Sequence, residues 1–121
     1  MKVMVTGHRP ERLGNKATSA AVWLDSQLRE LKPDIAITGM AAGADQIFAE
    51  LALKQRISLA AALPWKKDWD KYHPVVQRML EQADEVVYAY DHYDKRGYVA
   101  RDKIMVDAAD IFLGQILSLT R

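Results

Sequence analysis

The sequence predicts an α/β protein, a Rossmann-like three-layer sandwich on a mainly parallel sheet of about five strands. Three observations lead to this fold class. Short apolar runs alternate with stretches of helical periodicity, and Gly or Pro marks most of the turns between them. The 121 residues are 50% hydrophobic, which suits one core and one domain over 1–121. Strands that alternate with helices form a parallel sheet covered on both faces.

The expected strands follow from the apolar runs and from the residues that stop them. Gly7, Gly39 and Pro64 end the first three runs. The fourth run lies between an acidic pair and a charged loop. The expected strands are 3–6, 35–38, 57–63 and 86–90, with a last apolar segment that begins at 111–113.

Helical spacing of apolar residues places the helices between these strands. Leu24, Leu28 and Leu31 recur on one face of the first helix, and Pro33 ends it. Pro74 suits the first turn of the third helix. The expected helices are 16–32, about 42–55, 73–84 and 100–109, with a polar loop rich in Trp at 65–72 and a charged loop at 91–98.

Charge and composition exclude several classes of function. The 17 Lys and Arg against 16 Asp and Glu give a net charge of +1, too little to attract nucleic acid or an anionic membrane. The absence of Cys excludes disulfides, thiolate metal sites and Cys nucleophiles, and fits a reducing cytoplasm. The longest apolar run, 57–64, is far shorter than the ~20 residues of a membrane helix. No signal peptide is expected. We expect a cytoplasmic protein without metal or cofactor.

Two of the expected strands end in loops that suit an anion. Ligands of parallel sheets bind beyond the carboxyl ends of the strands. Loop 7–10 carries Arg9 within a basic stretch. Loop 39–45 is made of small residues and leads into a helix, whose N-terminus favours negative charge. The sequence therefore predicts a phosphate site, for which the candidates are Gly7, His8, Arg9, Gly39, Met40, Ala41, Gly43 and Asp45.

Each of these residues also has an ordinary structural interpretation. Gly39 and Gly43 are equally expected in a simple turn, and the spacing is neither that of a dinucleotide fingerprint nor that of a phosphate loop. His8 suits a turn as well as a site. Asp45 has two open interpretations, capping of the helix or binding of a ribose hydroxyl.

The two loops together resemble the SLOG superfamily, which joins DprA to the Lonely Guy phosphoribohydrolases. The similarity is greatest to a small bacterial and phage branch with a TGHRP start and a GMAxGxD motif, here Thr6-Gly7-His8-Arg9-Pro10 and Gly39-Met40-Ala41-Ala42-Gly43-Ala44-Asp45. Arg101 and Met105-Val106-Asp107 match a later part of the pattern. The resemblance implies a Rossmann-like domain that binds a nucleotide or nucleotide-derived ligand, with Arg101 and Asp107 contributed by the last helix.

Two departures from this pattern matter. Asp102 stands where the branch usually has Asn. Relatives continue past the last strand into a Gly-Gly-Thr turn and another helix, whereas this sequence ends in an apolar segment with Leu113, Ile116, Leu117 and Leu119. The domain is therefore expected to be short at its C-terminus, and the segment is a candidate contact between copies. The catalytic Glu of the phosphoribohydrolases is missing, which leaves Asp45, Glu50 and Asp107 as candidate carboxylates.

Three functions follow as hypotheses. The leading one is binding of a nucleotide-type small molecule, as in a sensor or signalling module. The second is an N-glycosidase or phosphoribohydrolase acting on a nucleoside monophosphate, which needs a carboxylate at the anomeric carbon. The third, single-stranded DNA binding of the DprA kind, is disfavoured by the net charge of +1. Trp65, Trp69 and Tyr72, interleaved with Lys, are candidates to stack a base or to pack over the sheet.

Overall fold

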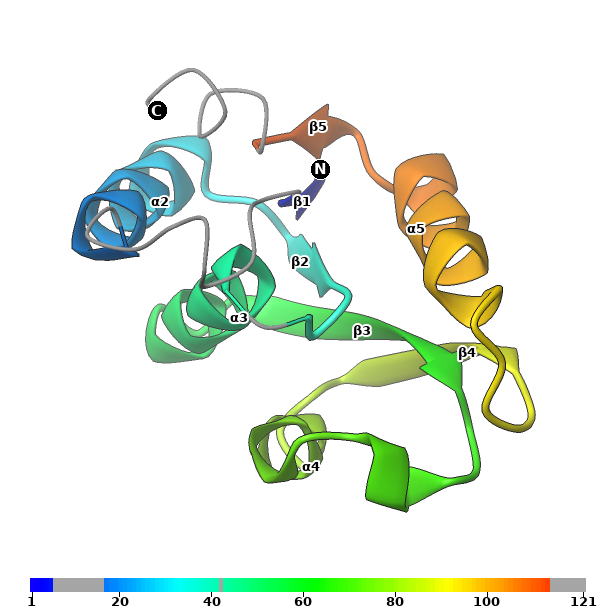
Figure 1. The fold of residues 1–121 in the computed structure, drawn as a ribbon. Helices are drawn as coiled ribbons and strands as arrows, with labels where there is room; N and C mark the ends of the chain where they lie inside the picture. The colour runs from blue at the N-terminus through cyan, green and yellow to red at the C-terminus, as the bar shows by residue number, and fades with distance from the viewer. Residues whose placement is uncertain (6–16, 42, 114–121) are drawn as a thin grey trace.

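The computed structural model describes residues 1–5, 17–41 and 43–113, and they fold around one five-stranded sheet (Figure 1). The strand order is β4-β3-β2-β1-β5, and every neighbouring pair is parallel. The strands are β1 (Lys2–Met4), β2 (Ile35–Thr38), β3 (Ser58–Trp65), β4 (Glu85–Tyr90) and β5 (Ile111–Phe112). The predicted Rossmann-like α/β class is confirmed.

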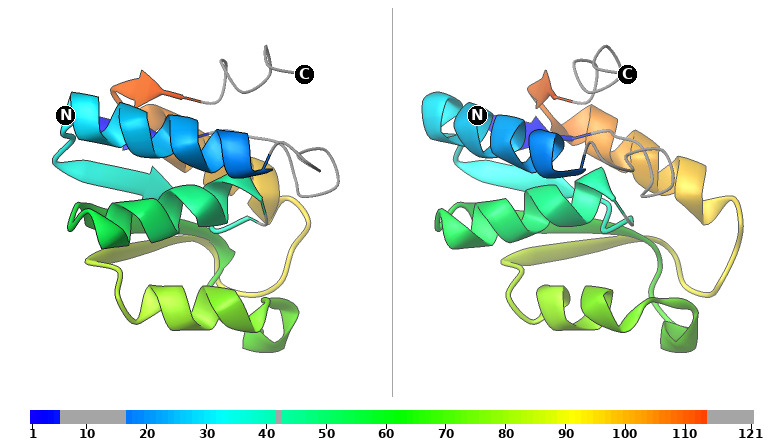
Figure 2. Two further views of the ribbon diagram at one scale, coloured as in Figure 1. Left: turned by 90° about the vertical axis from the view of Figure 1, so that its left-hand side faces the viewer. Right: turned by 60° about the vertical axis from the view of Figure 1, so that its left-hand side comes forward.

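The helices form a layer on each face of the sheet. Among the described residues, α2, α3 and α4 lie side by side on one face, and α5 is the only helix on the other (Figures 1 and 2). Their bounds are α2 (Ala17–Leu31), α3 (Ala44–Lys54), α4 (Pro74–Leu80) and α5 (Gly97–Ala108), and a short 3-10 turn, η2 (Trp69–Lys71), precedes α4.

Side chains that alternate along the strands divide the interior into two cores. Val3 packs with the larger core, under α2, α3 and α4, whereas the next residue, Met4, packs with the smaller core under α5. Leu24 and Leu28 of α2 and Phe48 of α3 are fully buried in the larger core. The smaller core has Met4, Ile37, Ala62 and Met105 as its buried members.

Strand β3 runs two residues past its predicted end, through Pro64 to Trp65. The proline is tolerated because β2 pairs with β3 only as far as Ala61. Beyond that point β3 pairs with β4 alone, and Trp65 lies opposite Tyr90. A residue without an N–H costs no ladder hydrogen bond on the open side.

Two helix boundaries differ from the prediction. Helix α4 ends at Leu80 rather than at 84, because Asp84 is held by β3: its N–H donates to the Leu59 carbonyl at 2.8 Å and its carboxylate accepts the Leu59 N–H at 2.9 Å. Helix α5 begins at Gly97, three residues before its predicted start at 100. The Asp94 carbonyl accepts the Gly97 N–H at 2.9 Å, which organises this first turn within the predicted loop.

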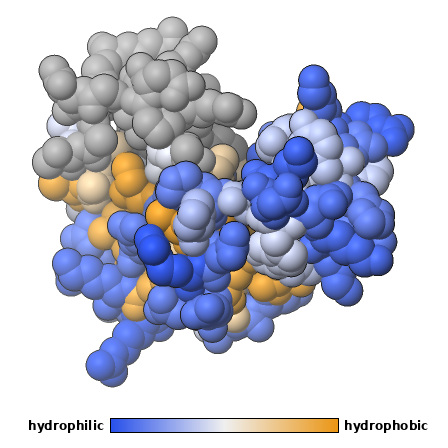
Figure 3. All heavy atoms as spheres, turned by 60° about the horizontal axis from the view of Figure 1, so that its bottom comes forward, coloured by the Kyte–Doolittle hydropathy of each residue, from blue (hydrophilic) through white to orange (hydrophobic). Residues whose placement is uncertain are grey.

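The surface over α4 and the loop before it is mostly hydrophilic, with hydrophobic residues visible between the polar ones (Figure 3). None of the helices in the described ranges is long and apolar enough to cross a membrane. Leu113, the first member of the predicted apolar segment, is buried in the larger core. Ile116, Leu117 and Leu119 lie outside the described residues.

The larger core should control stability. Leu24 is fully buried, so Leu24→Ala should lower the free energy of unfolding by about 2–5 kcal/mol, through lost apolar burial and the cavity left behind. Val22, two residues away on the same helix, is 66% exposed, and Val22→Ala should change stability by less than about 0.5 kcal/mol. Urea denaturation measures both. Equal losses in the two variants would contradict the assignment of the buried face of α2.

Candidate functional site

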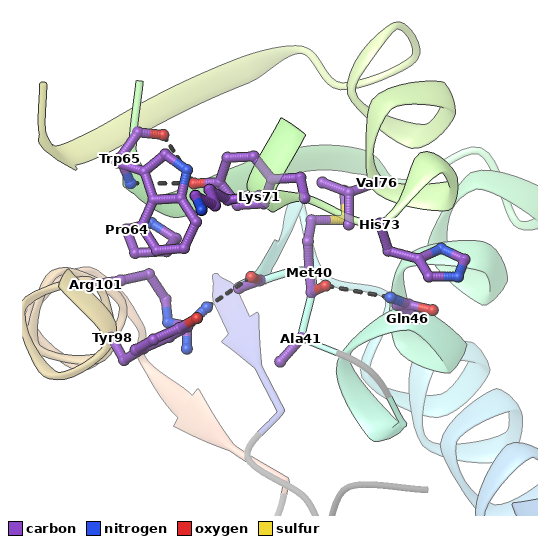
Figure 4. Close-up of a pocket in the computed structure, with 12 residues that line it drawn as sticks. Met40, Ala41, Gln46, Pro64, Trp65, Lys71, His73, Val76, Tyr98 and Arg101 are labelled. Carbon is purple, nitrogen blue, oxygen red and sulfur yellow. Dashed lines mark hydrogen bonds between the residues drawn. The ribbon is translucent and has the colours of Figure 1, made fainter. Parts of the chain in front are cut away.

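A cavity of about 430 Å³ lies at the carboxyl ends of β2 and β3, where parallel α/β proteins bind their ligands. Its volume falls within the range of small-molecule sites. Helices α3, α4 and α5 and the loop after β3 complete its walls (Figure 4). The lining residues are Gly39, Met40, Ala41, Gln46, Pro64, Trp65, Lys71, Tyr72, His73, Val76, Tyr98 and Arg101.

The lining of this cavity is basic although the chain as a whole is nearly neutral. Arg101 and Lys71 supply two positive charges, and no described residue of the lining is an acid. A concave site lined by one sign of charge concentrates ligands of the opposite sign. The cavity therefore suits an anion.

Arg101 is the most constrained of these basic residues. Only 7% of the residue is exposed. Its Nη1 donates to the Gly39 carbonyl at 2.7 Å, and its Nε donates to the Asp102 carboxylate at 2.7 Å. The Tyr98 ring lies 5.9 Å from the guanidinium carbon. Within the described ranges, Nη2 has no hydrogen-bond partner, which leaves a donor for a ligand.

Two glycines let helix α5 approach the strand ends. A Cβ on Gly97 would lie 2.7 Å from the Pro64 carbonyl oxygen, so the start of α5 packs directly on the end of β3. Arg101 is one turn further along the same face of the helix. A Cβ on Gly39 would lie 2.9 Å from both Arg101 and the Asp45 carboxylate. Glycine at both positions is therefore a packing requirement of the site, beyond ordinary turn chemistry.

The loop after β2 is held by short polar contacts. The Thr38 hydroxyl accepts the Met40 N–H at 3.1 Å and donates to the Asp45 carbonyl at 3.0 Å. The Asp45 carboxylate accepts the Ala41 N–H at 3.3 Å. Gly43 is the N-cap of α3 with a φ of 93°, and no side chain caps that end. Asp45 thus reaches back to the loop from the first turn of α3, rather than capping the helix from the N-cap position.

Burial raises the pKa of the Asp45 carboxyl from 3.8 to about 6, against the opposing effect of the Arg101 charge. The hydrogen bonds from the loop N–H groups also lower this pKa, and the Asp102 charge raises it. A carboxyl with a pKa near 6 is able to hold or release a proton close to neutral pH.

Aromatic side chains build the wall on the β3 side. The Trp65 ring stacks on Tyr72 at 4.7 Å and meets Tyr98 edge to face at 5.6 Å, and the residue is only 1% exposed. The Tyr72 hydroxyl donates to the Trp65 carbonyl at 2.7 Å and accepts the Trp65 N–H at 3.0 Å. Burial raises the pKa of Tyr72 to about 12. Trp65 and Tyr72 therefore act mainly as a packed wall, and Trp69 lies outside the lining.

The predicted site residues divide into three groups. Gly39, Met40, Ala41 and Arg101 meet in the cavity, with Asp45 against Gly39. Gly43, Glu50 and Asp107 do not line it, and the side chains of Glu50 and Asp107 are exposed. Gly7, His8 and Arg9 lie outside the described residues. Among the described residues, no cluster of three acidic or His side chains is placed to hold a metal ion.

Six lining residues are not among the predicted site residues: Gln46, Pro64, Lys71, His73, Val76 and Tyr98. The sequence predicts a loop at Tyr98. In the structure Tyr98 lies in the first turn of α5, three residues before Arg101, so the two share a face of the helix. His73 stands at a predicted helix start, and the three His of the sequence are too scattered to indicate a metal site. Gln46 follows Asp45 directly and carried no signal of its own.

Comparison with solved structures identifies a similar fold. The chain resembles DNA processing protein A (DprA) from Streptococcus pneumoniae. The TM-score is 0.63 at 23% sequence identity, over 86% of this chain and 37% of DprA, so the chain spans little more than a third of that protein's length. This likeness confirms the DprA-like fold. No protein-family model and no curated protein matches the sequence.

The raised pKa of Asp45 should appear in the pH dependence of stability. Its carboxyl is protonated in the folded protein below about pH 6, so folding is disfavoured as the pH rises through that value. Since one pKa unit corresponds to about 1.4 kcal/mol, the ionised carboxylate costs the folded state roughly 2–3 kcal/mol at neutral pH. Asp45→Asn should therefore stabilise the protein at pH 7.5 and bring little gain at pH 4, as measured by urea denaturation.

Asp107→Asn is the control for this measurement, because the Asp107 side chain is exposed on α5. It should change stability little at either pH. An equal destabilisation by Asp45→Asn at both pH values would contradict the account of a buried, partly protonated carboxyl.

Proposed function

We propose that this domain binds a nucleotide-type small molecule in the cavity at the ends of β2 and β3. The observation that carries the proposal is the buried Arg101, whose guanidinium reaches the cavity from α5 and is fixed on the Gly39 carbonyl. A guanidinium offers a rigid fork of donors that matches a phosphate. A positively charged side chain held in this way is already oriented for an anion before the ligand arrives.

The rest of the cavity supports the same ligand class. Lys71 adds a second positive charge to the lining, while Met40, Val76, Pro64 and the aromatic wall supply apolar surface. Few charged groups among mainly apolar neighbours are typical of small-molecule sites. The protein of similar fold is named for DNA processing, but a concave site with two lining cations suits a small ligand better than the extended contacts of DNA.

Arg101→Lys tests the phosphate contact without deleting the charge. Lysine lacks the fork and cannot keep both the Gly39 carbonyl and a phosphate, so the affinity for AMP should fall at least about 10-fold. Isothermal titration calorimetry with AMP measures this, with thermal unfolding to check that the variant folds. The matched control is Arg78→Lys, at an exposed position on α4.

Unchanged affinity in Arg101→Lys, or the absence of binding to any member of a panel of AMP, ADP-ribose, NAD and cyclic nucleotides, would contradict the proposal. Equal losses in the Arg101 and Arg78 variants would do so as well, because Arg78 does not line the cavity.

A second candidate function is hydrolysis of the N-glycosidic bond of a nucleoside monophosphate. The observation that favours it is Asp45, a partly buried carboxyl with a pKa raised to about 6 beside the cavity floor at Gly39. In this reaction the C–N bond breaks, water adds to the anomeric carbon, and the base leaves with a proton. A carboxyl of this kind suits the transfer of that proton.

Release of free base from AMP, followed by chromatography, tests this second function. Wild-type protein should release adenine and Asp45→Asn should not, whereas Glu50→Gln, at an exposed position on the same helix, should retain the activity. Binding of AMP without base release in the wild type would leave the domain a binding module and reject the enzyme.

A further inference from the structure

We infer that Asp102 is a positioning residue of the candidate site, because its carboxylate turns the Arg101 guanidinium so that one end of that group stays available to a ligand. This inference rests on the proposed nucleotide site and adds a residue that acts on that site from outside the cavity. Arg101 reaches the cavity from α5 (Figure 4) and lines it, whereas Asp102 is not part of the lining. Asp102 therefore acts on a ligand through Arg101 and not by contact.

The contact between these two side chains is unusual for an α-helix. Arg101 and Asp102 are neighbours in α5, and side chains at successive positions of a helix do not face each other. The Arg101 side chain is 8% exposed, whereas that of Asp102 is 65% exposed. The hydrogen bond of 2.7 Å from Arg101 Nε to the Asp102 carboxylate therefore requires the long arginine side chain to bend toward its exposed neighbour.

A second contact holds the guanidinium from another side. Its Nη1 donates to the Gly39 carbonyl at 2.7 Å, and a Cβ on Gly39 would lie 2.9 Å from both Cδ and Nη1 of Arg101. Gly39 therefore lies on the Cδ side of the group. A guanidinium has five N–H groups, and these two contacts use two of them. Within the described ranges the other three, one on Nη1 and two on Nη2, have no partner, and the Nη1–Nη2 end keeps a fork of donors for an anion.

The Asp102 carboxylate has two opposite effects on an anion in the cavity. Its hydrogen bond satisfies the buried Nε–H of Arg101. Without an acceptor there, that donor would stay unpaired or the guanidinium would turn toward another partner. Its negative charge opposes an anion, but water around a side chain that is 65% exposed screens this charge. The orienting hydrogen bond is therefore the larger of the two effects.

Two substitutions in the intact chain separate the hydrogen bond from the charge. Asp102→Asn keeps an oxygen that accepts the Nε–H and removes the charge, so AMP should bind about 2- to 3-fold more tightly. Asp102→Ala removes both, so AMP should bind at least about 5-fold more weakly although a negative charge is lost. Isothermal titration calorimetry measures the affinities, and thermal unfolding checks that each variant folds. Asp107→Asn and Asp107→Ala remove the same charge at an exposed position of the same helix, and both should change the affinity by less than about 2-fold.

The protein without ligand provides a second measurement. The Arg101 Nε–H signal in NMR spectra, assigned by its loss in Arg101→Lys, should exchange slowly with water in the wild type and in Asp102→Asn. In Asp102→Ala its exchange should become much faster, because the acceptor is gone. The Nε–H of Arg78, at an exposed position on α4, is the reference for fast exchange.

Unchanged or higher affinity for AMP in Asp102→Ala, or equal losses in the Asn and Ala variants, would overturn the positioning role while AMP binding stands. Slow exchange of the Arg101 Nε–H in Asp102→Ala would overturn it as well. Absence of AMP binding to the wild-type protein would instead reject the nucleotide site, and the exchange rates would then decide separately whether Asp102 orients Arg101.

Discussion

The hydrogen bond from Arg101 Nη1 to the Gly39 carbonyl joins the two layers on which the candidate site depends. Helix α5 is the only helix on its face of the sheet in the part of the chain that the structure describes, and this contact fixes it to the end of β2. A buried guanidinium is stable only with hydrogen-bond partners, so the carbonyl and the Asp102 carboxylate are both needed. The same bond aims the remaining face of the guanidinium into the cavity.

The glycines explain how such a bond is possible. Gly97 lets α5 lie against Pro64. Because Gly39 has no side chain, Arg101 and the Asp45 carboxylate can both pack against its α-carbon. The result is a positively charged side chain and a partly protonated carboxyl close together at the floor of the cavity. Neither group would hold its position with a larger residue between them. The close approach of backbone and side chains therefore positions the Arg101 charge and buries the Asp45 carboxyl, which raises its pKa.

Most of the fold could be predicted from the sequence because the strands are short apolar runs and the helices on one face are amphipathic. The prediction failed where tertiary contacts set the boundaries. Helix α4 stops early because Asp84 bonds to β3, and β3 passes through Pro64 because β2 no longer pairs with it there. Helix α5 was the hardest to delimit. It buries Arg101 and exposes Val99 to 75%, so its apolar pattern does not follow its buried face.

The site could be predicted only where its residues belong to local sequence patterns. Gly39 and Arg101 belong to recognisable motifs, and strand ends are where ligands of parallel sheets bind. Gln46, His73 and Tyr98 carry no such pattern, since they become neighbours only through the packing of α3, α4 and α5. The aromatic and Lys residues around Trp65 predict that its ring could stack on a base. In the structure its ring is covered by Tyr72 and two further tyrosines.

Methyl NMR of methionine-labelled protein would test the central claim most directly, because the chain has five Met and each reports on its own surroundings. Met40 lines the cavity and packs with the larger core, whereas Met4 belongs to the smaller core, away from the lining. Titration with AMP should shift the Met40 methyl signal progressively and leave that of Met4 in place. A spectrum unchanged at saturating AMP, or one in which Met4 moves and Met40 does not, would contradict a nucleotide site at the ends of β2 and β3.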